Sequence, residues 1–201
     1  MKKNNGMMIV LSAPSGSGKG TVIKILTDGG EYALSISVTT RAPRPNEIDG
    51  RDYFFSTKQE FEELIKNGDL LEYTEYNGYY YGTPKKYVEE QIAAGKIVIL
   101  EIEVDGALQV KKRFTESVLI FMTPPDKKEL ERRLTLRKTQ TNVSIRERLE
   151  IADREIEKID SYDYYVVNDI VEEAVKKIET IVAAERLRPF RNKHAIENFS
   201  K

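Results

Sequence analysis

The stretch Ile9–Thr21, IVLSAPSGSGKGT, decides the fold of this chain. Its first four residues, Ile9–Ser12, are apolar or small and predict a short buried strand. A turn rich in Ser and Gly follows, and Lys19 opens the helical pattern TVIKIL. These are the parts of a phosphate-binding loop, in which backbone N–H groups and the positive end of a helix dipole converge on one anion. We therefore expect Lys19 to meet the terminal phosphates of a nucleotide.

The predicted loop departs from the strict pattern GxxxxGK[ST]. Ala13 stands where the first glycine would be. Gly20 follows Lys19, so Thr21 comes one residue late. The alternative is a Ser/Gly-rich turn with an incidental lysine, but the strand before it and the helix after it favour a phosphate loop. The residues of the predicted loop are Ala13, Pro14, Ser15, Gly16, Ser17, Gly18, Lys19, Gly20 and Thr21.

The composition narrows the function classes. A chain of 201 residues fits one domain with inserted subdomains. Its 32 basic and 33 acidic residues leave a formal charge of −1, so we expect no nucleic-acid partner. The absence of cysteine excludes disulfides and thiolate metal sites. The single histidine, His194, lies in a polar tail, which argues against a histidine metal centre or a Ser-His-Asp triad.

Hydropathy gives no sign of a membrane protein. No stretch reaches the roughly 18 apolar residues of a membrane helix. The start, MKKNNGMMIVL, has too short an apolar run and no cleavage pattern for a signal peptide. We expect a cytoplasmic protein without membrane contact, and any metal should be bound by oxygen, as Mg²⁺ is.

Apolar periodicity predicts alternating strands and helices. Strands are expected near 8–12, 34–38, 97–103, 117–122 and 163–167. Helices are expected near 19–27, 105–113, 126–137, 144–159 and 170–187. This alternation indicates an α/β fold with a parallel sheet covered on both faces.

Two segments interrupt that alternation. Residues 39–96 hold the Pro-rich stretch TTRAPRPNEIDGRDYFF, a helical pattern, and short aromatic strands around Asn77-Gly78, which is a strong hairpin signal. They are most simply an inserted subdomain that ends with a helix begun by Thr83 and Pro84. Residues 129–151 are rich in arginine and predict a helix–loop–helix flap over the phosphate site.

The stretch TTRAPRPNEIDGRDYFF closely resembles the signature of guanylate kinases, which phosphorylate GMP with ATP. The resemblance continues through EYTEYNGYYYGTP, LEIEVDGALQV and VVND, and covers about residues 7–188. It implies a P-loop kinase core with a five-stranded parallel sheet, a GMP-binding insertion and a helical lid that close on the substrates. The implied core is 1–38, 97–128 and 152–191, the insertion 39–96, the lid 129–151 and the tail 192–201.

The resemblance implies a site for the GMP phosphate. Arg41 and Arg44 would clamp it, helped by the hydroxyls of Tyr53 and Tyr81. Guanidinium groups suit phosphate because two parallel N–H bonds reach two oxygens. The alternative is a pair of surface arginines in a Pro-rich loop.

Glu72 is the residue expected to read the base. Guanine offers two neighbouring N–H donors that one carboxylate accepts together, whereas adenine presents an acceptor there. The resemblance places Ser37, Thr83 and Glu103 in the same GMP site. The alternative for Glu72 is a solvated strand residue paired with a lysine.

Two carboxylates follow each other on the predicted strand 97–103. Glu101 and Glu103 stand at alternate positions and so should face one side. The family usually has aspartate at both places, the first near Mg²⁺ and the second near guanine. Glu101 is therefore the implied Mg²⁺ ligand, directly or through water, and Thr21 is a second candidate.

The lid supplies further phosphate contacts by resemblance. Lys138 stands where the family commonly has glycine, which puts the lid-loop geometry in question. The alternative is that ELERRLTLR forms a salt-bridged amphipathic helix. The residues implied to act in catalysis are Lys19, Arg41, Arg133, Arg137 and Arg148.

The hypothesis is an enzyme that transfers phosphate from ATP to GMP, with Mg²⁺ as the cofactor and a monomer or homodimer as the assembly. The phosphate loop would bind ATP, and Asn168 matches a family position near adenine, although asparagine after a strand is also an ordinary turn residue. Two alternatives stay open: a non-catalytic binding module of the same fold, and a kinase of the same fold acting on another phosphorylated acceptor.

Overall fold

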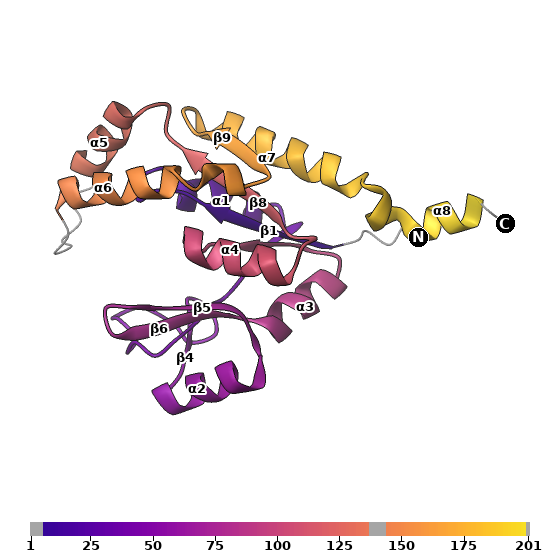
Figure 1. Ribbon diagram of the computed structural model, residues 1–201, viewed down its shortest axis with the longest axis horizontal. Helices are drawn as coiled ribbons and strands as arrows, with labels where there is room; N and C mark the ends of the chain where they lie inside the picture. Colours follow the sequence, from indigo (N-terminus) through magenta and orange to yellow (C-terminus); the bar gives the residue numbers. More distant parts are fainter. Residues whose placement is uncertain (1–5, 137–143, 200–201) are drawn as a thin grey trace.

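The computed structural model describes residues 6–136 and 144–199 (Figure 1). Its strands are β1 Met7–Ser12, β2 Tyr32–Leu34, β3 Val38–Thr39, β4 Phe54–Phe55, β5 Leu70–Tyr76, β6 Tyr79–Pro84, β7 Ile97–Leu100, β8 Val118–Thr123 and β9 Tyr164–Val167. Its helices are α1 Lys19–Asp28, α2 Lys58–Asn67, α3 Lys85–Ala93, α4 Val104–Arg113, α5 Lys127–Leu136, α6 Ile145–Ile156, α7 Val171–Arg186 and α8 Lys193–Phe199. Two 3-10 turns, η1 Ile159–Ser161 and η2 Pro189–Asn192, complete the order.

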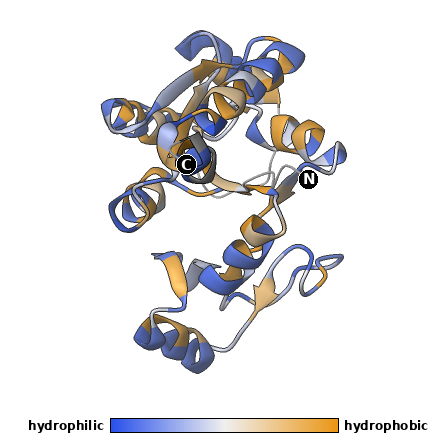
Figure 2. Ribbon diagram, turned by 90° about the vertical axis from the view of Figure 1, so that its right-hand side faces the viewer, coloured by the Kyte–Doolittle hydropathy of each residue, from blue (hydrophilic) through white to orange (hydrophobic). Residues whose placement is uncertain are grey.

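The core is a five-stranded parallel sheet in the order β2-β7-β1-β8-β9, which confirms the predicted fold class. Ile9 and Leu11 of the central strand β1 pack with α1 and α7 on one face. Met8 and Val10, which point the other way, pack with α3 and α4. Both faces are therefore buried, as a parallel sheet requires. In Figure 2 the helices around this sheet carry hydrophobic residues on one side and hydrophilic residues on the other.

Two predicted strands differ from those observed. The strand expected at 34–38 is divided between β2 in the core and β3 in a second sheet, because residues 35–37 carry the chain from one sheet to the other. The strand expected at 97–103 ends at Leu100, and Glu101 and Glu103 lie beyond it, exposed. A strand covered by helices on both faces offers no partner for carboxylates, so the strand ends where the charges begin.

The second sheet has the order β4-β3-β6-β5 and forms the end of the molecule that also holds α2 (Figure 1). The hairpin β5–β6 turns at Asn77 and Gly78, with φ of 51° and 77°, so the predicted turn is confirmed. Helix α2 begins at a capping box, in which Thr57 and Glu60 satisfy each other's backbone N–H groups. Its Phe61 is fully buried against this sheet.

Helices α5 and α6 lie side by side at one end of the molecule (Figure 1). Leu130 and Leu134 of α5 pack with Ala152 of α6. An ion pair of 2.6 Å joins Lys127 to Asp153 across the two helices. Within the described part of the chain, no helix is both long and apolar enough to cross a membrane.

Candidate active site

The turn between β1 and α1 has the shape predicted for a phosphate loop. Gly16 and Gly18 adopt φ of 93° and 84°, which other residues rarely adopt. Gly18 is the N-cap of α1 and makes no side-chain hydrogen bond, so the positive end of the helix is open to an anion. A Cβ atom on Gly18 would lie 2.6 Å from Nδ2 of Asn168, so no larger residue fits here.

Asn168 and Arg133 hold this loop from behind. The buried Asn168 side chain donates from Nδ2 to the Ser17 carbonyl at 2.8 Å. Arg133 donates from Nη1 to the Asn168 carbonyl at 3.0 Å, and its Nε donates to Glu129 at 2.7 Å. These contacts tie the loop to the end of β9 and to α5. Asn168 thus contacts the loop backbone, and Arg133 reaches the back of the loop and also lines the cavity in front of it.

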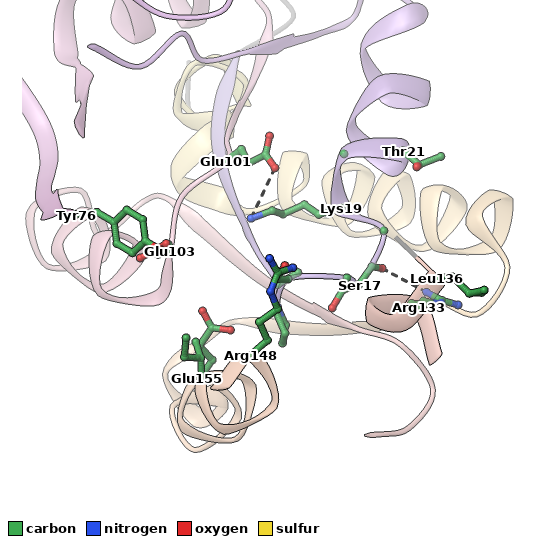
Figure 3. Close-up of a pocket in the computed structure, with 17 residues that line it drawn as sticks. Ser17, Lys19, Thr21, Tyr76, Glu101, Glu103, Arg133, Leu136, Arg148 and Glu155 are labelled. Atoms are coloured by element: carbon green, nitrogen blue, oxygen red, sulfur yellow. Dashed lines mark hydrogen bonds and ion pairs between the residues drawn. The ribbon is translucent and has the colours of Figure 1, made fainter. Parts of the chain in front are cut away.

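A cavity of about 980 Å³ opens in front of the loop (Figure 3). Lys19 points from the start of α1 toward Glu101, with 3.8 Å between Nζ and Oε1 (Figure 3). The cavity is lined by Ala13, Pro14, Ser15, Gly16, Ser17, Gly18, Lys19, Gly20, Thr21, Tyr76, Glu101, Glu103, Arg133, Leu136, Arg148, Ile151 and Glu155. Every residue of the predicted phosphate loop therefore borders one cavity.

The α5–α6 pair forms the outer wall of this cavity. Arg148 and Glu155 project from α6 on the same side (Figure 3). Burial raises the pKa of the Glu155 carboxyl, nearby Glu103 raises it further, and Lys19 opposes the shift. The predicted catalytic residue Arg137 lies outside the described residues, as does Lys138.

A second cavity of about 490 Å³ adjoins the first. It is lined by Lys19, Leu34, Ser35, Ser37, Asp52, Tyr53, Glu72, Thr74, Tyr76, Tyr81, Gly82, Glu101, Ile102, Glu103, Asp105 and Gly106. Four of these residues, Lys19, Tyr76, Glu101 and Glu103, also line the first cavity. The two spaces thus meet at the lysine of the phosphate loop.

Glu72 lies on the buried wall of the second cavity and is 3% exposed. The Thr83 hydroxyl donates to Glu72 Oε1 at 2.6 Å. Burial raises the pKa of the Glu72 carboxyl, and the Thr83 hydrogen bond opposes that shift. Thr83 itself is fully buried, so it positions Glu72 from behind.

Arg41 lies beside the second cavity. Both of its terminal nitrogens donate to the Glu47 carboxylate, each at 2.9 Å. Its guanidinium carbon is 5.4 Å from the ring centroid of Tyr53, which lines the cavity with Tyr81. Hydrogen bonds, foremost from Arg41, lower the pKa of the Glu47 carboxyl. Arg41 is therefore held at the rim by an acidic residue that the sequence did not single out.

Arg44 is exposed on the same loop. Its backbone N–H donates to Glu47 Oε2 at 2.7 Å, so one carboxylate orders the chain at both predicted phosphate clamps. Glu47, the partner of Arg41, was not predicted from the sequence, and neither were Tyr76 and Glu155 among the residues that line the first cavity. Glu47 lies within the stretch TTRAPRPNEIDGRDYFF, but its pairing with Arg41 depends on the loop conformation.

The residues present fit a magnesium ion shared with a nucleotide. Among residues 6–136 and 144–199, no group of three His, Cys, Asp or Glu residues could hold a metal alone. Mg²⁺ ordinarily takes only one or two carboxylates and completes its shell with water and substrate phosphates. Glu101, with a side chain 40% exposed, offers such a carboxylate. Thr21, the second candidate ligand, lines the same cavity but projects from the other side of the first turn of α1 (Figure 3).

Comparison with known proteins gives one consistent result. The family model for guanylate kinase matches residues 5–185. A relative named guanylate kinase from Oceanobacillus iheyensis is 52% identical over 189 residues, covering 94% of this chain and 92% of its own. Another from Listeria innocua is 52% identical over 191 residues, covering 94% of this chain and 93% of its own. The crystal structure of guanylate kinase from Anaplasma phagocytophilum is 34% identical, with a TM-score of 0.72 over 94% of this chain and 90% of that one.

Proposed function

The chain belongs to the guanylate kinase family, and from this premise we propose that its two adjoining cavities hold ATP and GMP for phosphoryl transfer. A GMP phosphate oxygen attacks the γ-phosphorus of ATP, the bond to the β–γ bridging oxygen breaks, and GDP and ADP result. The observation that carries the proposal is the shared wall of the two cavities, with Lys19 at their junction.

The ATP side is the phosphate loop. Its backbone N–H groups and the open N-terminus of α1 receive the phosphates, and Lys19 adds a positive charge. Leu136 and Ile151 give the same cavity an apolar wall from the α5–α6 pair. Asn168 supports this side by holding the Ser17 carbonyl.

The GMP side is the second cavity. Glu72 accepts the two guanine N–H donors, and Ser37 and Glu103 line the same cavity. The GMP phosphate lies toward Tyr53 and Tyr81. Arg41 and Arg44 approach it from the rim of this cavity.

Little acid–base chemistry is needed for the transfer itself. The second pKa of a phosphate monoester is about 6, so the attacking oxygen is already ionised at neutral pH. The task is to hold two like-charged groups in line and to neutralise the charge between them. Lys19, Arg41, Arg133 and Arg148 do this, together with Arg137.

Glu101 would hold a magnesium ion that binds with ATP, and Thr21, which lines the same cavity, is the second candidate ligand. When bound, the ion would neutralise part of the charge on the phosphates. We further propose that residues 39–96 and 129–151 are the parts that close on the substrates. The cytoplasmic location and the choice between monomer and homodimer stay predictions.

A coupled assay for ADP tests the proposal. Purified protein with ATP and Mg²⁺ should turn over with GMP and far more slowly with AMP, CMP or UMP. Lys19→Ala should abolish turnover, whereas Lys24→Ala, on the exposed side of the same helix, should not. Absence of ATP binding and turnover would indicate a non-catalytic module. Equal turnover with another monophosphate would indicate a different acceptor.

A further inference from the structure

Gly106 lies in the first turn of α4, on the wall of the second cavity. Its φ is outside the left-handed region, so its backbone conformation suits any residue. Glycine inside a helix costs about 1 kcal/mol relative to alanine. The backbone of this helix therefore gives no reason for a glycine at position 106.

The carboxylate of Glu72 gives that reason. A Cβ atom on Gly106 would lie 2.9 Å from Glu72 Oε2 and 3.4 Å from its carboxyl carbon. The next nearest atom, Cδ1 of Ile102, would be at an ordinary 3.5 Å. The missing side chain thus makes room for one oxygen of the buried carboxylate.

We propose that Gly106 is a specificity-determining position, whose missing side chain lets Glu72 lie where it reads guanine. The proposal rests on the proposed function. Thr83 holds Oε1 at 2.6 Å on one side, and the bare first turn of α4 borders Oε2 on the other. Glu72 is consequently confined from two directions, and an enlarged residue 106 would move the carboxylate.

The positive end of α4 opposes burial and the nearby charge of Glu103, both of which raise the pKa of Glu72. The Ala107 N–H donates to the Glu103 carbonyl at 2.9 Å, so the N–H groups before residue 107 belong to the open first turn of α4. Glu103, the N-cap, makes no side-chain hydrogen bond to that turn. The positive end of the helix therefore lies beside the carboxylate that must accept the guanine donors.

Gly106→Ala tests the proposal because it should weaken the binding of GMP without lowering the stability of the fold. Alanine suits the helix, and the crowded atom is the movable end of Glu72, so the melting temperature should not fall. The KM for GMP should rise by roughly 10-fold or more, since a small displacement of a binding group can cost up to about 100-fold. The KM for ATP should stay unchanged. Gly29→Ala is the matched control: Gly29 caps α1 at φ −76°, and its Cβ would meet only Leu26 O, at 3.9 Å.

A second variant checks the mechanism. Glu72→Asp shortens the side chain by one methylene and withdraws the carboxylate from the new methyl group. The double variant Gly106→Ala/Glu72→Asp should therefore raise the KM for GMP by less than the product of the fold increases of the two single variants.

An unchanged KM for GMP in Gly106→Ala overturns the proposal, as do equal losses toward ATP and GMP or a variant that fails to fold. The proposal is also overturned if the fold increase in the KM for GMP of the double variant equals the product of those of the two single variants. Wild-type protein in the same assay separates the two proposals: without GMP turnover there, the proposed function fails first.

Discussion

Replacing Asn168 by Asp changes one group in the contact that holds the phosphate loop. Nδ2 of Asn168, a residue 1% exposed, donates to the Ser17 carbonyl at 2.8 Å. In Asn168→Asp two acceptors would face each other at that distance. The Ser17 carbonyl would keep the longer hydrogen bond from Arg133 Nη1, at 3.5 Å, so its loss should be at the lower end of the about 1–3 kcal/mol that an unsatisfied buried carbonyl costs. Burying the new carboxylate costs several kcal/mol more, which the nearby guanidinium of Arg133 offsets in part.

A net loss of about 3 kcal/mol is therefore expected, which lowers the melting temperature of a chain this long by roughly 6–12 °C. Asn168→Ala removes the same donor without adding a charge and should lose less. Burial raises the pKa of the new carboxyl in the folded protein. Its destabilising effect is consequently absent below the unfolded pKa of about 3.9 and grows as pH rises through the folded pKa.

Thermal melts at pH 5 and pH 8 measure the stability of the variant. Kinetics with ATP or GTP as the donor measure whether Asn168 also affects the choice of nucleotide. The melting temperature of Asn168→Asp should fall at both pH values, and further at pH 8. Asn67→Asp, at the exposed end of α2, should stay within about 0.5 kcal/mol of wild type. An unchanged melting temperature with an altered preference between ATP and GTP would refute the reasoning and restore a role in reading adenine.

Two further substitutions address the GMP side. Glu47→Gln should raise the KM for GMP roughly 10-fold without changing that for ATP, because Arg41 loses the carboxylate that orients it. Glu62→Gln, on exposed α2, is its control, and equal KM values in the two variants would remove Glu47 from this role. Glu72→Gln should lower kcat/KM for GMP by roughly 100-fold at neutral pH, since an amide offers one acceptor and turns a donor toward a guanine donor. Burial raises the pKa of Glu72, so wild-type kcat/KM should fall as acidification protonates it, at a pH above the ordinary value. If kcat/KM of Glu72→Gln still falls in the same acidic range, the fall is caused by a group other than Glu72.

The core of the fold was predictable because its signals are local. β1, β8 and β9 are short apolar runs, and the observed bounds differ from the expected ones by one residue. The break between β2 and β3 was not predictable. Residues 34–38 alternate like one strand, yet Leu34 pairs with Ile99 and Val38 pairs with Gly82 of another sheet. The difference lies in the pairing partners, which are distant in sequence.

In the candidate site, too, some residues were predictable from local patterns and others were not. The phosphate loop, its lysine and the position of Glu72 on a strand follow from short patterns. The two carboxylates after Leu100 are a near miss: alternation placed them inside the sheet, whereas they line the cavities beyond its carboxyl edge. The partners of Arg41 and Asn168 come from loop shape and from strands brought together by the sheet, which no local pattern encodes.

These partners explain how a chain of net charge −1 could hold two polyanions. Lys19 faces Glu101, Arg41 faces Glu47 and Arg133 faces Glu129, at 3.8, 2.9 and 2.7 Å. Each of these three cations thus has an acidic partner before a nucleotide arrives. In the proposed function, a phosphate group would bind by replacing or joining a carboxylate at a cation already held in place. Because the paired side chains have little conformational entropy left to lose on binding, the pairing favours precise alignment of the two phosphates. It does so at the expense of the strength of electrostatic binding.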